Sequence, residues 1–291
     1  MSSEIEKVFD FNFHLPIITS NNVNETIDQD LNLNEDKLNQ GLDYYKSYLN
    51  KIKGFNLLLF NTDLFSNSIS TFSKCLKNFN NVSMSSLIDF RRHDIYDYID
   101  ILVQKNVKTI MVNSYLQKIS KRDLSLVLKV LKYCEKKNLI ICIDGSYGTS
   151  KMLEFDNLKL MCNVAEIIKK SPIVIIHSGG LRIKQVLLLA LENHNIYFDT
   201  SFSLPFYIDS SLEKDFAFTY KKIGTDRVFY GSDSPYLNPN VHWAALVRTL
   251  THLIRSRTHL FLDNENRIAT CRRNSNRLDL FAEYLRTAQL C

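Results

Sequence analysis

The chain has 291 residues, of which 45% are hydrophobic and 23% charged, so it can bury a large core. Its 36 basic and 31 acidic side chains give a net charge of +5, well below the charge density of a dedicated nucleic-acid-binding protein. No apolar run approaches the roughly 18 residues that span a bilayer, and the first residues do not resemble a signal peptide. We therefore expect a globular cytoplasmic protein that binds neither nucleic acid nor membrane.

Six cysteines are scattered singly along the chain, without any C-x-x-C pair. They are Cys75, Cys134, Cys142, Cys162, Cys271 and Cys291. This spacing is typical neither of a zinc ribbon nor of a small disulfide scaffold. We expect reduced thiols, which agrees with a cytoplasmic location.

Eight short apolar runs alternate with longer amphipathic stretches, which is typical of βα units around a parallel sheet. The runs are residues 8–15, 55–60, 82–90, 107–112, 139–143, 173–177, 196–200 and 228–232. Several are apolar on both faces, as strands of a parallel sheet are when both faces are buried. Eight runs of this kind predict an α/β fold, the (β/α)8 TIM barrel.

Four stretches between these runs carry apolar residues at helical spacing, and we predict them as outer helices. They are residues 97–104, 124–137, 157–170 and 182–193. The Asn-rich and acidic segment 19–40 predicts a surface loop in its first half, near the mouth of the barrel. We expect one domain over residues 1–291, with a loop and a helix over 19–53 and closing helices over 241–291.

Polar side chains end four of the predicted strands, where a parallel barrel places its functional groups. They are Asp10, Asn12 and His14 on the first strand, Asp144 on the fifth, His177 on the sixth and Asp233 on the eighth. The period of two along a strand places the three polar residues of the first strand on one face, toward the barrel interior. Taken singly, such a residue is more often a helix cap or a hydrogen-bonded core residue. Together they indicate a site, because buried carboxylates and imidazoles are costly unless they pair or bind a metal.

Five stretches of the chain carry a further signal when they are taken in order. They are FDFNFHL at 9–15, IIHSGG at 175–180, IYFDTS at 196–201, RVFYGSDSPY at 227–236 and NSNRL at 274–278. Together they resemble the strand motifs of the amidohydrolase-related (amidohydrolase 2) metal-dependent hydrolases. The resemblance covers nearly the whole chain.

The resemblance implies particular metal ligands, a His-x-His pair on strand one and a histidine on strand five, together with an aspartate on strand eight that is metal-binding or catalytic. It also implies a histidine on strand six. His14, His177 and Asp233 match, whereas Asn12 and Asp144 stand where two of the histidines belong. A ligand set of His14, Asp144 and Asp233, with Asn12 assisting, is rich in oxygen. Such a set favours Mn²⁺, Mg²⁺ or Fe²⁺ without excluding Zn²⁺, and loss of the metal is the alternative.

The resemblance further implies hydrolysis of a C–N or C–O bond, or non-oxidative decarboxylation, of a small carbonyl or carboxylate substrate. In our hypothesis Asp233 is the base and His177 stabilises the oxyanion. Two alternatives stay open: a metal-free enzyme of the lactonase type, and a degenerate barrel that serves as a binding protein. Substrate and oligomeric state, including a homo-oligomer, also stay open. Loop side chains set the substrate, and one sequence does not place them in space.

Overall fold

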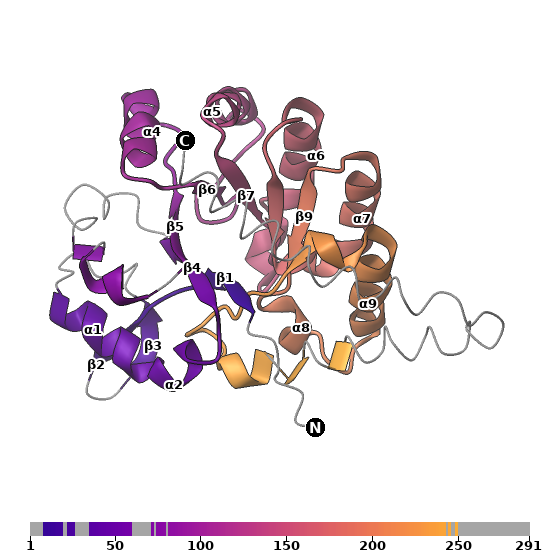
Figure 1. Ribbon diagram of the computed structural model, residues 1–291. Coiled ribbons are helices and arrows are strands. Elements are labelled where there is room, and N and C mark those ends of the chain that lie inside the picture. Colours follow the sequence, from indigo (N-terminus) through magenta and orange to yellow (C-terminus); the bar gives the residue numbers. More distant parts are fainter. Residues whose placement is uncertain are drawn as a thin grey trace, which may run out of the picture.

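The computed structural model describes residues 8–19, 22–26, 35–59, 71–72, 74–79, 81–242, 244–245 and 248–249. Eight parallel strands form one sheet in the order β1-β4-β5-β6-β7-β8-β9-β10 (Figure 1). Their bounds are β1 Phe9–Phe13, β4 Gly54–Leu59, β5 Val82–Leu87, β6 Thr109–Val112, β7 Ile140–Asp144, β8 Ile173–Ile176, β9 Ile196–Asp199 and β10 Val228–Phe229. All eight predicted runs are therefore strands.

The first and last strands meet, so the sheet curls into a nearly closed barrel. The backbone N–H of Phe11 donates to the Tyr230 carbonyl at 2.7 Å, and that of His14 donates to the Ser234 carbonyl at 2.8 Å. A parallel bridge between Phe13 and Ser234 continues the contact. The predicted (β/α)8 barrel is confirmed.

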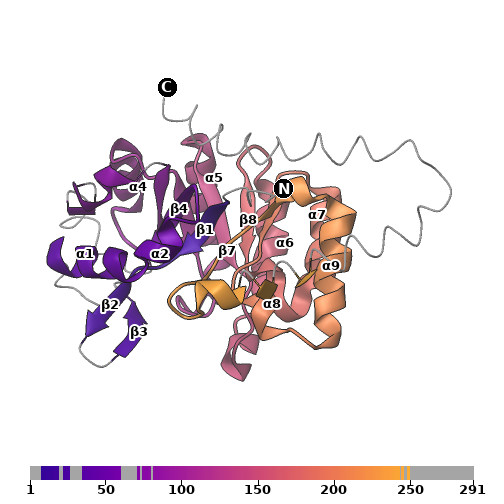
Figure 2. The same cartoon turned by 60° about the horizontal axis from the view of Figure 1, so that its bottom comes forward.

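Helices surround the barrel (Figure 2). They are α1 Glu35–Tyr44, α2 Lys46–Leu49, α4 Ile95–Gln104, α5 Leu124–Lys136, α6 Asn157–Ile167, α7 Ile183–Glu192, α8 Ser203–Phe206 and α9 Ser211–Ile223. Short 3₁₀ turns lie at Leu76–Asn78 (η2), Ser150–Leu153 (η3), His177–Arg182 (η4) and Thr225–Arg227 (η5). The four helices predicted from amphipathic spacing correspond to α4, α5, α6 and α7. None of the described helices is long and apolar enough to cross a membrane.

Two layers of apolar side chains explain why the strands read as continuous hydrophobic runs. The barrel interior is filled from nearly every strand, by Phe11, Leu58, Leu87, Met111, Ile140, Cys142, Val174, Ile176 and Phe229. A larger cluster lies between the strands and the helices, with Ile141 and Ile143 of β7 packed toward α5 and α6. Alternate residues of β7 therefore serve the two layers, and both faces of the strand are buried.

The face assignment predicted for the first strand is wrong at Asp10. A shift in the pairing register lies between Asp10 and Phe13, which indicates a β-bulge, and a bulge changes the alternation of faces. Phe11 faces the barrel interior, whereas Phe13 belongs to the layer under the helices. Asp10 lies on the helix side as well, where the Tyr48 hydroxyl donates to it at 2.5 Å. Asp10 is therefore not part of the polar cluster inside the barrel mouth.

The segment after β1 is more ordered than the predicted loop. Strands β2 (Pro16–Thr19) and β3 (Asn22–Thr26) form an antiparallel pair, and the pair packs against α1. Strand β3 has the sequence NVNET, and this polar composition is not typical of a strand. Of the closing helices predicted over 241–291, only residues 241–242, 244–245 and 248–249 are described. Those helices stay a prediction.

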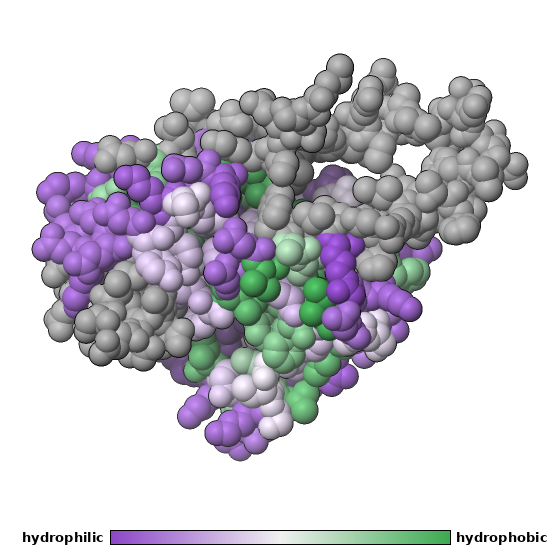
Figure 3. Space-filling view, turned by 90° about the horizontal axis from the view of Figure 1, so that it is seen from below, coloured by the Kyte–Doolittle hydropathy of each residue, from purple (hydrophilic) through white to green (hydrophobic). Residues whose placement is uncertain are grey.

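The elements that follow strand ends gather on one side of the barrel. The β2–β3 pair and α8 lie on the lower side in Figures 1 and 2, and apolar side chains collect in the middle of the face seen in Figure 3. Leu153, Phe206 and Tyr236, which follow β7, β9 and β10, are each about half exposed. The mouth of the barrel is therefore partly apolar.

Candidate active site

The polar residues predicted at the strand ends form one buried cluster at the carboxyl end of the barrel. Asn12 and His14 come from β1 and the residue after it, Asp144 ends β7, His177 follows β8 and Asp233 follows β10. All five are less than a tenth exposed. The parallel arrangement brings these sequence-distant groups together, as expected for a barrel of this type.

Asn12 joins two other members of the cluster through its amide nitrogen. Nδ2 donates to Ser201 Oγ at 2.8 Å and to Asp233 Oδ1 at 3.3 Å. The side-chain oxygen Oδ1 of Asn12 is buried and has no hydrogen-bond partner among the described residues. Asn12 therefore acts toward Asp233 as a hydrogen-bond donor.

Asp233 is held between Asn12 and His14. His14 Nε2 lies 3.7 Å from Asp233 Oδ1, and the backbone N–H of Asp233 donates to the backbone carbonyl of Asn12 at 2.9 Å. The Tyr236 ring packs against His14, with ring centroids 5.4 Å apart. Tyr236 thus reaches the cluster from the loop after β10.

His177 is hydrogen-bonded through Nδ1, and its other ring nitrogen faces Asp144. Nδ1 lies 2.9 Å from Ser201 Oγ and 3.1 Å from the Ser201 carbonyl, and Nε2 lies 3.7 Å from Asp144 Oδ2. The backbone of His177 is in the left-handed region, with φ of 60°, and Asp233 has φ of 55°. Left-handed conformations are uncommon for residues with side chains and cluster at functional sites.

Asp144 is already hydrogen-bonded through one oxygen. Asp144 Oδ1 accepts from Ser146 N at 2.9 Å and from Ser146 Oγ at 2.8 Å, and Asn157 Nδ2 lies 3.4 Å away. Only Oδ2 faces His177. The described contacts therefore pair Asp144 with His177 and pair His14 with Asp233.

The electrostatics of the cluster favour a charged pair. Burial alone would raise the pKa of Asp233, but His177 and His14 outweigh it and hold the pKa below the usual aspartate value. Burial alone would lower the pKa of His177, but Asp233 and Asp144 raise it above the usual histidine value. Asp233 is thus ionised at neutral pH, and His177 retains its proton to higher pH than an exposed histidine.

Asp199 belongs to the cluster although it was not among the predicted site residues. Asp199 Oδ1 accepts the backbone N–H groups of His177 at 3.1 Å and Ser201 at 3.2 Å, and it also accepts the Ser201 hydroxyl. Burial raises its pKa to about 6. The sequence does contain a signal for Asp199, because this residue ends the seventh predicted strand just as Asp144 ends the fifth.

His242 interacts electrostatically with Asp233, although no pattern in the sequence assigned it a role. It is fully buried, and its Nε2 lies 2.8 Å from the Thr200 carbonyl. Burial lowers its pKa to about 4. A carbonyl only accepts, so Nε2 carries the proton and the ring is neutral at pH 7. No strand end marks His242 in the sequence, because it lies in a helical segment.

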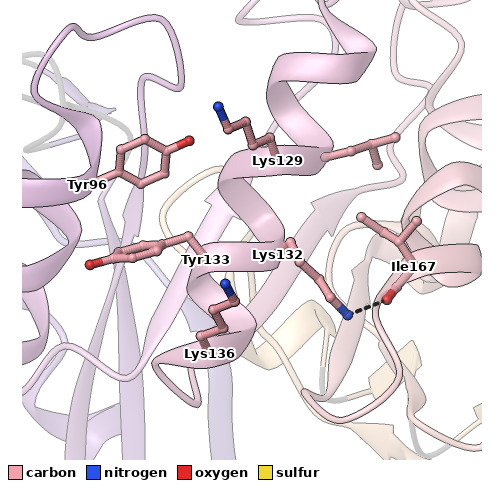
Figure 4. Close-up of a pocket in the computed structure, with 7 residues that line it drawn as sticks. Tyr96, Lys129, Lys132, Tyr133, Lys136 and Ile167 are labelled. Atoms are coloured by element: carbon pink, nitrogen blue, oxygen red, sulfur yellow. Dashed lines mark hydrogen bonds between the residues drawn. The ribbon is translucent and has the colours of Figure 1, made fainter.

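A hollow lies on the outer surface of the protein, away from the strand ends. A groove of about 590 Å³ runs between α4, α5 and the end of α6 (Figure 4). It is lined by Tyr96, Leu128, Lys129, Lys132, Tyr133, Lys136 and Ile167. Lys132 Nζ donates to the Ile167 carbonyl at 2.9 Å across it. No residue of the buried cluster lines this groove.

A family model described as Amidohydrolase matches residues 94–278, which is more than half of the chain. This chain belongs to the amidohydrolase family. The resemblance carried by the strand motifs is thereby confirmed, and so is the prediction of a hydrolase-type enzyme. No curated protein matches this amidohydrolase in sequence.

Solved structures share the fold of this amidohydrolase at low sequence identity. An uncharacterised TIM-barrel protein from Bordetella bronchiseptica is 11% identical with a TM-score of 0.64, over 88% of this chain and 98% of that one. A putative 2-pyrone-4,6-dicarboxylic acid hydrolase from Pseudomonas putida is 13% identical with a TM-score of 0.54, over 85% and 90%. A 2,6-dihydroxybenzoate decarboxylase is 12% identical with a TM-score of 0.58, over 94% and 97%. At such identities these structures establish the fold.

Divalent metals are usual in the amidohydrolase family, and a metal centre would require the donor atoms of the cluster to point at one position. They do not fit one, since Asn12 presents a donor nitrogen to Asp233 and Asp144 Oδ1 is already occupied by Ser146. Within the described part of the chain, no three His, Cys, Asp or Glu side chains are grouped as a metal ion requires. The assignment of His14, Asp144, Asp233 and Asn12 as metal ligands stays a prediction.

Proposed function

We propose that this amidohydrolase hydrolyses a C–O or C–N bond next to the carbonyl of a small substrate, with Asp233 as general base and His177 as oxyanion stabiliser. The observation that carries the proposal is the buried cluster at the strand ends, where His14 Nε2 lies 3.7 Å from Asp233 and His177 Nε2 lies 3.7 Å from Asp144. The charges of this cluster lower the pKa of Asp233 and raise the pKa of His177. Both residues also have left-handed backbones, which other groups of the cluster hold in place.

In the proposed reaction, Asp233 accepts a proton from water as the water oxygen bonds to the carbonyl carbon. The carbonyl oxygen becomes an oxyanion, which the protonated His177 ring stabilises by charge and hydrogen bonding. Collapse of the intermediate breaks the C–O or C–N bond, and the leaving atom takes the proton back from Asp233. As the oxyanion forms, it neutralises the charge of His177, so His177 no longer holds the pKa of Asp233 so low. The base therefore strengthens when the proton has to be taken.

Asn12 takes the place of a cationic partner in this proposal. Its amide hydrogens face Asp233 and Ser201, so they keep the Asp233 carboxylate in position without a charge on Asn12. The half-exposed Leu153, Phe206 and Tyr236 give the mouth an apolar character that suits a ring or a short carbon skeleton. Lactones, cyclic amides and aromatic or pyrone acids are accordingly the substrate classes to assay first.

The test is a panel of compounds with the purified protein, covering lactones, 2-pyrone-4,6-dicarboxylate, hydantoins and 2,6-dihydroxybenzoate. Ring opening is expected for one of the first three, and Asp233→Asn is expected to lower kcat/KM by about 10²–10⁴-fold. The matched control is Asp226→Asn, which changes an exposed aspartate on η5. Full activity of Asp233→Asn would show that Asp233 is not the base.

Three further results would each replace this proposal with an alternative. Release of CO₂ from 2,6-dihydroxybenzoate, without ring opening of the other compounds, would make the protein a decarboxylase. Activity that a chelator abolishes and Mn²⁺ or Zn²⁺ restores would return the metal to the mechanism, with His14, Asp144 and Asp233 as its ligands. Saturable binding of a panel compound without turnover would favour the degenerate barrel.

A further inference from the structure

Ser201 connects the two side chains that we propose act on the substrate. Its Oγ lies 2.9 Å from His177 Nδ1 and 2.8 Å from Asn12 Nδ2. Asn12 Nδ2 in turn reaches Asp233 Oδ1 at 3.3 Å. Ser201 is fully buried and lies two residues after the end of β9. We propose that Ser201 is a positioning residue: its hydroxyl determines which atoms donate and which accept in the hydrogen bonds at His177 and at Asp233.

The direction of these hydrogen bonds follows from the fact that the Ser201 hydroxyl has only one proton to donate. An ionised carboxylate only accepts, so the contact between Ser201 Oγ and Asp199 Oδ1 takes that proton toward Asp199. Ser201 Oγ then accepts a hydrogen bond from Asn12. The Asn12 amide is therefore oriented with its nitrogen, rather than its oxygen, toward Ser201. The same nitrogen consequently presents its second hydrogen to Asp233.

The same reasoning fixes the protonated nitrogen of His177. The Ser201 carbonyl, 3.1 Å from Nδ1, has no hydrogen to give, and the hydroxyl proton is committed to Asp199. His177 Nδ1 therefore carries a hydrogen whether the ring is charged or neutral. Nε2, which faces Asp144 Oδ2 at 3.7 Å, is left as the nitrogen that changes its protonation.

Asp199 anchors the arrangement through the backbone. Its Oδ1 accepts the N–H of Ser201 and the N–H of His177, so one carboxylate oxygen holds both residues by their main chains. The Ser201 hydroxyl consequently has little freedom to turn toward another acceptor. Such supporting contacts orient the reacting groups before the substrate arrives.

The chain offers a matched control in Ser203. It is fully buried like Ser201, and its hydroxyl donates at 2.5 Å to the backbone carbonyl of His177 rather than to the ring. Ser201→Ala and Ser203→Ala therefore remove the same group beside the same histidine. Only the first removes the link between the His177 ring and the Asn12 amide.

The experiment is NMR of the full chain labelled with ¹⁵N in asparagine and histidine, which needs no substrate. In the unsubstituted protein above the pKa of His177, the ring nitrogen shifts are expected to show the Nδ1–H tautomer. In Ser201→Ala the Asn12 side-chain amide signal is expected to shift and its exchange with water to accelerate. Ser203→Ala is expected to leave that amide signal unchanged.

The kinetic consequence rests on the proposed function, whereas the NMR result does not. With a substrate from the panel, Ser201→Ala is expected to lower kcat by roughly 10- to 100-fold with little change in KM, as is common for groups that orient a reacting residue. The kcat of Ser203→Ala is expected to fall much less. If no substrate is turned over, the NMR comparison still decides the role of Ser201.

Two outcomes would overturn the inference. The first is an Nε2–H tautomer of His177 in the unsubstituted protein, a measurement that does not depend on the folding of any variant. The second is an Asn12 amide signal that responds equally to Ser201→Ala and Ser203→Ala, since that would show a general loss of packing rather than a specific link.

Discussion

The Asp10 carboxylate joins the first and last strands of the barrel by accepting the backbone N–H of Ser232 at 2.9 Å. Its other oxygen accepts the Tyr48 hydroxyl from α2 at 2.5 Å. Asp10 is fully buried, and burial raises its pKa to about 7. One side chain thus ties the closure of the barrel to helix α2.

Tyr48→Phe is expected to lower the free energy of unfolding by about 1–3 kcal/mol, because it leaves one oxygen of a buried carboxyl group without its donor. Chemical denaturation measures the change. Tyr44→Phe is the control, since Tyr44 is 53% exposed and its loss of a hydroxyl is expected to stay within about 0.5 kcal/mol. Equal stability of the two variants would show that the Tyr48 contact contributes nothing.

Gly231→Ala is expected to disrupt the candidate site. A Cβ at this position would lie 2.1 Å from Asp199 Oδ2 and 2.9 Å from Asn12 Cβ, so Asp199 or the strand has to move. We expect a loss of about 2 kcal/mol or more in unfolding free energy, and a changed Asn12 amide signal. In the control Gly148→Ala, the new Cβ meets nothing closer than 3.4 Å. A stable Gly231→Ala protein with an unaltered site would contradict the packing described for Asp199.

Restoring the two missing histidines is expected to create a metal site. The double variant Asn12→His, Asp144→His would add two imidazoles near His14 and Asp233, and imidazole is a preferred ligand of Zn²⁺. Elemental analysis after dialysis is expected to show one ion per chain in this variant and substoichiometric metal in the unsubstituted protein. Stoichiometric metal in the unsubstituted protein, lost in His14→Ala, would instead confirm the predicted ligand set.

Glu135 is expected to give the stability of the protein a marked acid dependence. It is buried in α5 and accepts the backbone N–H groups of Lys169 and Lys170, each at 2.7 Å, and the Lys132 ammonium at 2.5 Å. Burial alone would raise its pKa, but these donors outweigh burial and lower the pKa from 4.5 to about 2. The stabilisation is therefore complete above about pH 4.5 and is lost as the pH falls through about 2.

Denaturation of Glu135→Gln as a function of pH checks this expectation. The variant is expected to be less stable than the unsubstituted protein by about 3 kcal/mol at pH 7, with the difference shrinking as the pH falls below about 4.5. Glu166→Gln, which changes an exposed glutamate of α6, is the control. A difference that is constant with pH would show that the charge of Glu135 is not the stabilising feature.

Strand positions were predictable because burial on both faces leaves a continuous apolar run in the sequence. All eight runs are strands, and the four amphipathic stretches are helices. The β2–β3 pair was not predictable in this way, since β3 has the polar sequence NVNET and carries no apolar run. The face of Asp10 was missed because a register shift in β1 breaks the period of two.

The members of the candidate site were predictable only where each ends a strand. The sequence by itself determined the barrel, its family and the residues Asn12, His14, Asp144, His177 and Asp233, because local apolar patterns and ordered motifs carry that information. Only the tertiary structure decided that His14 pairs with Asp233 and His177 with Asp144, that Ser201 contacts both His177 and Asn12, and that His242 contacts the Thr200 carbonyl. These relations depend on distances between side chains that are up to 221 positions apart in the chain, as Asn12 and Asp233 are. Folding alone brings such groups into contact.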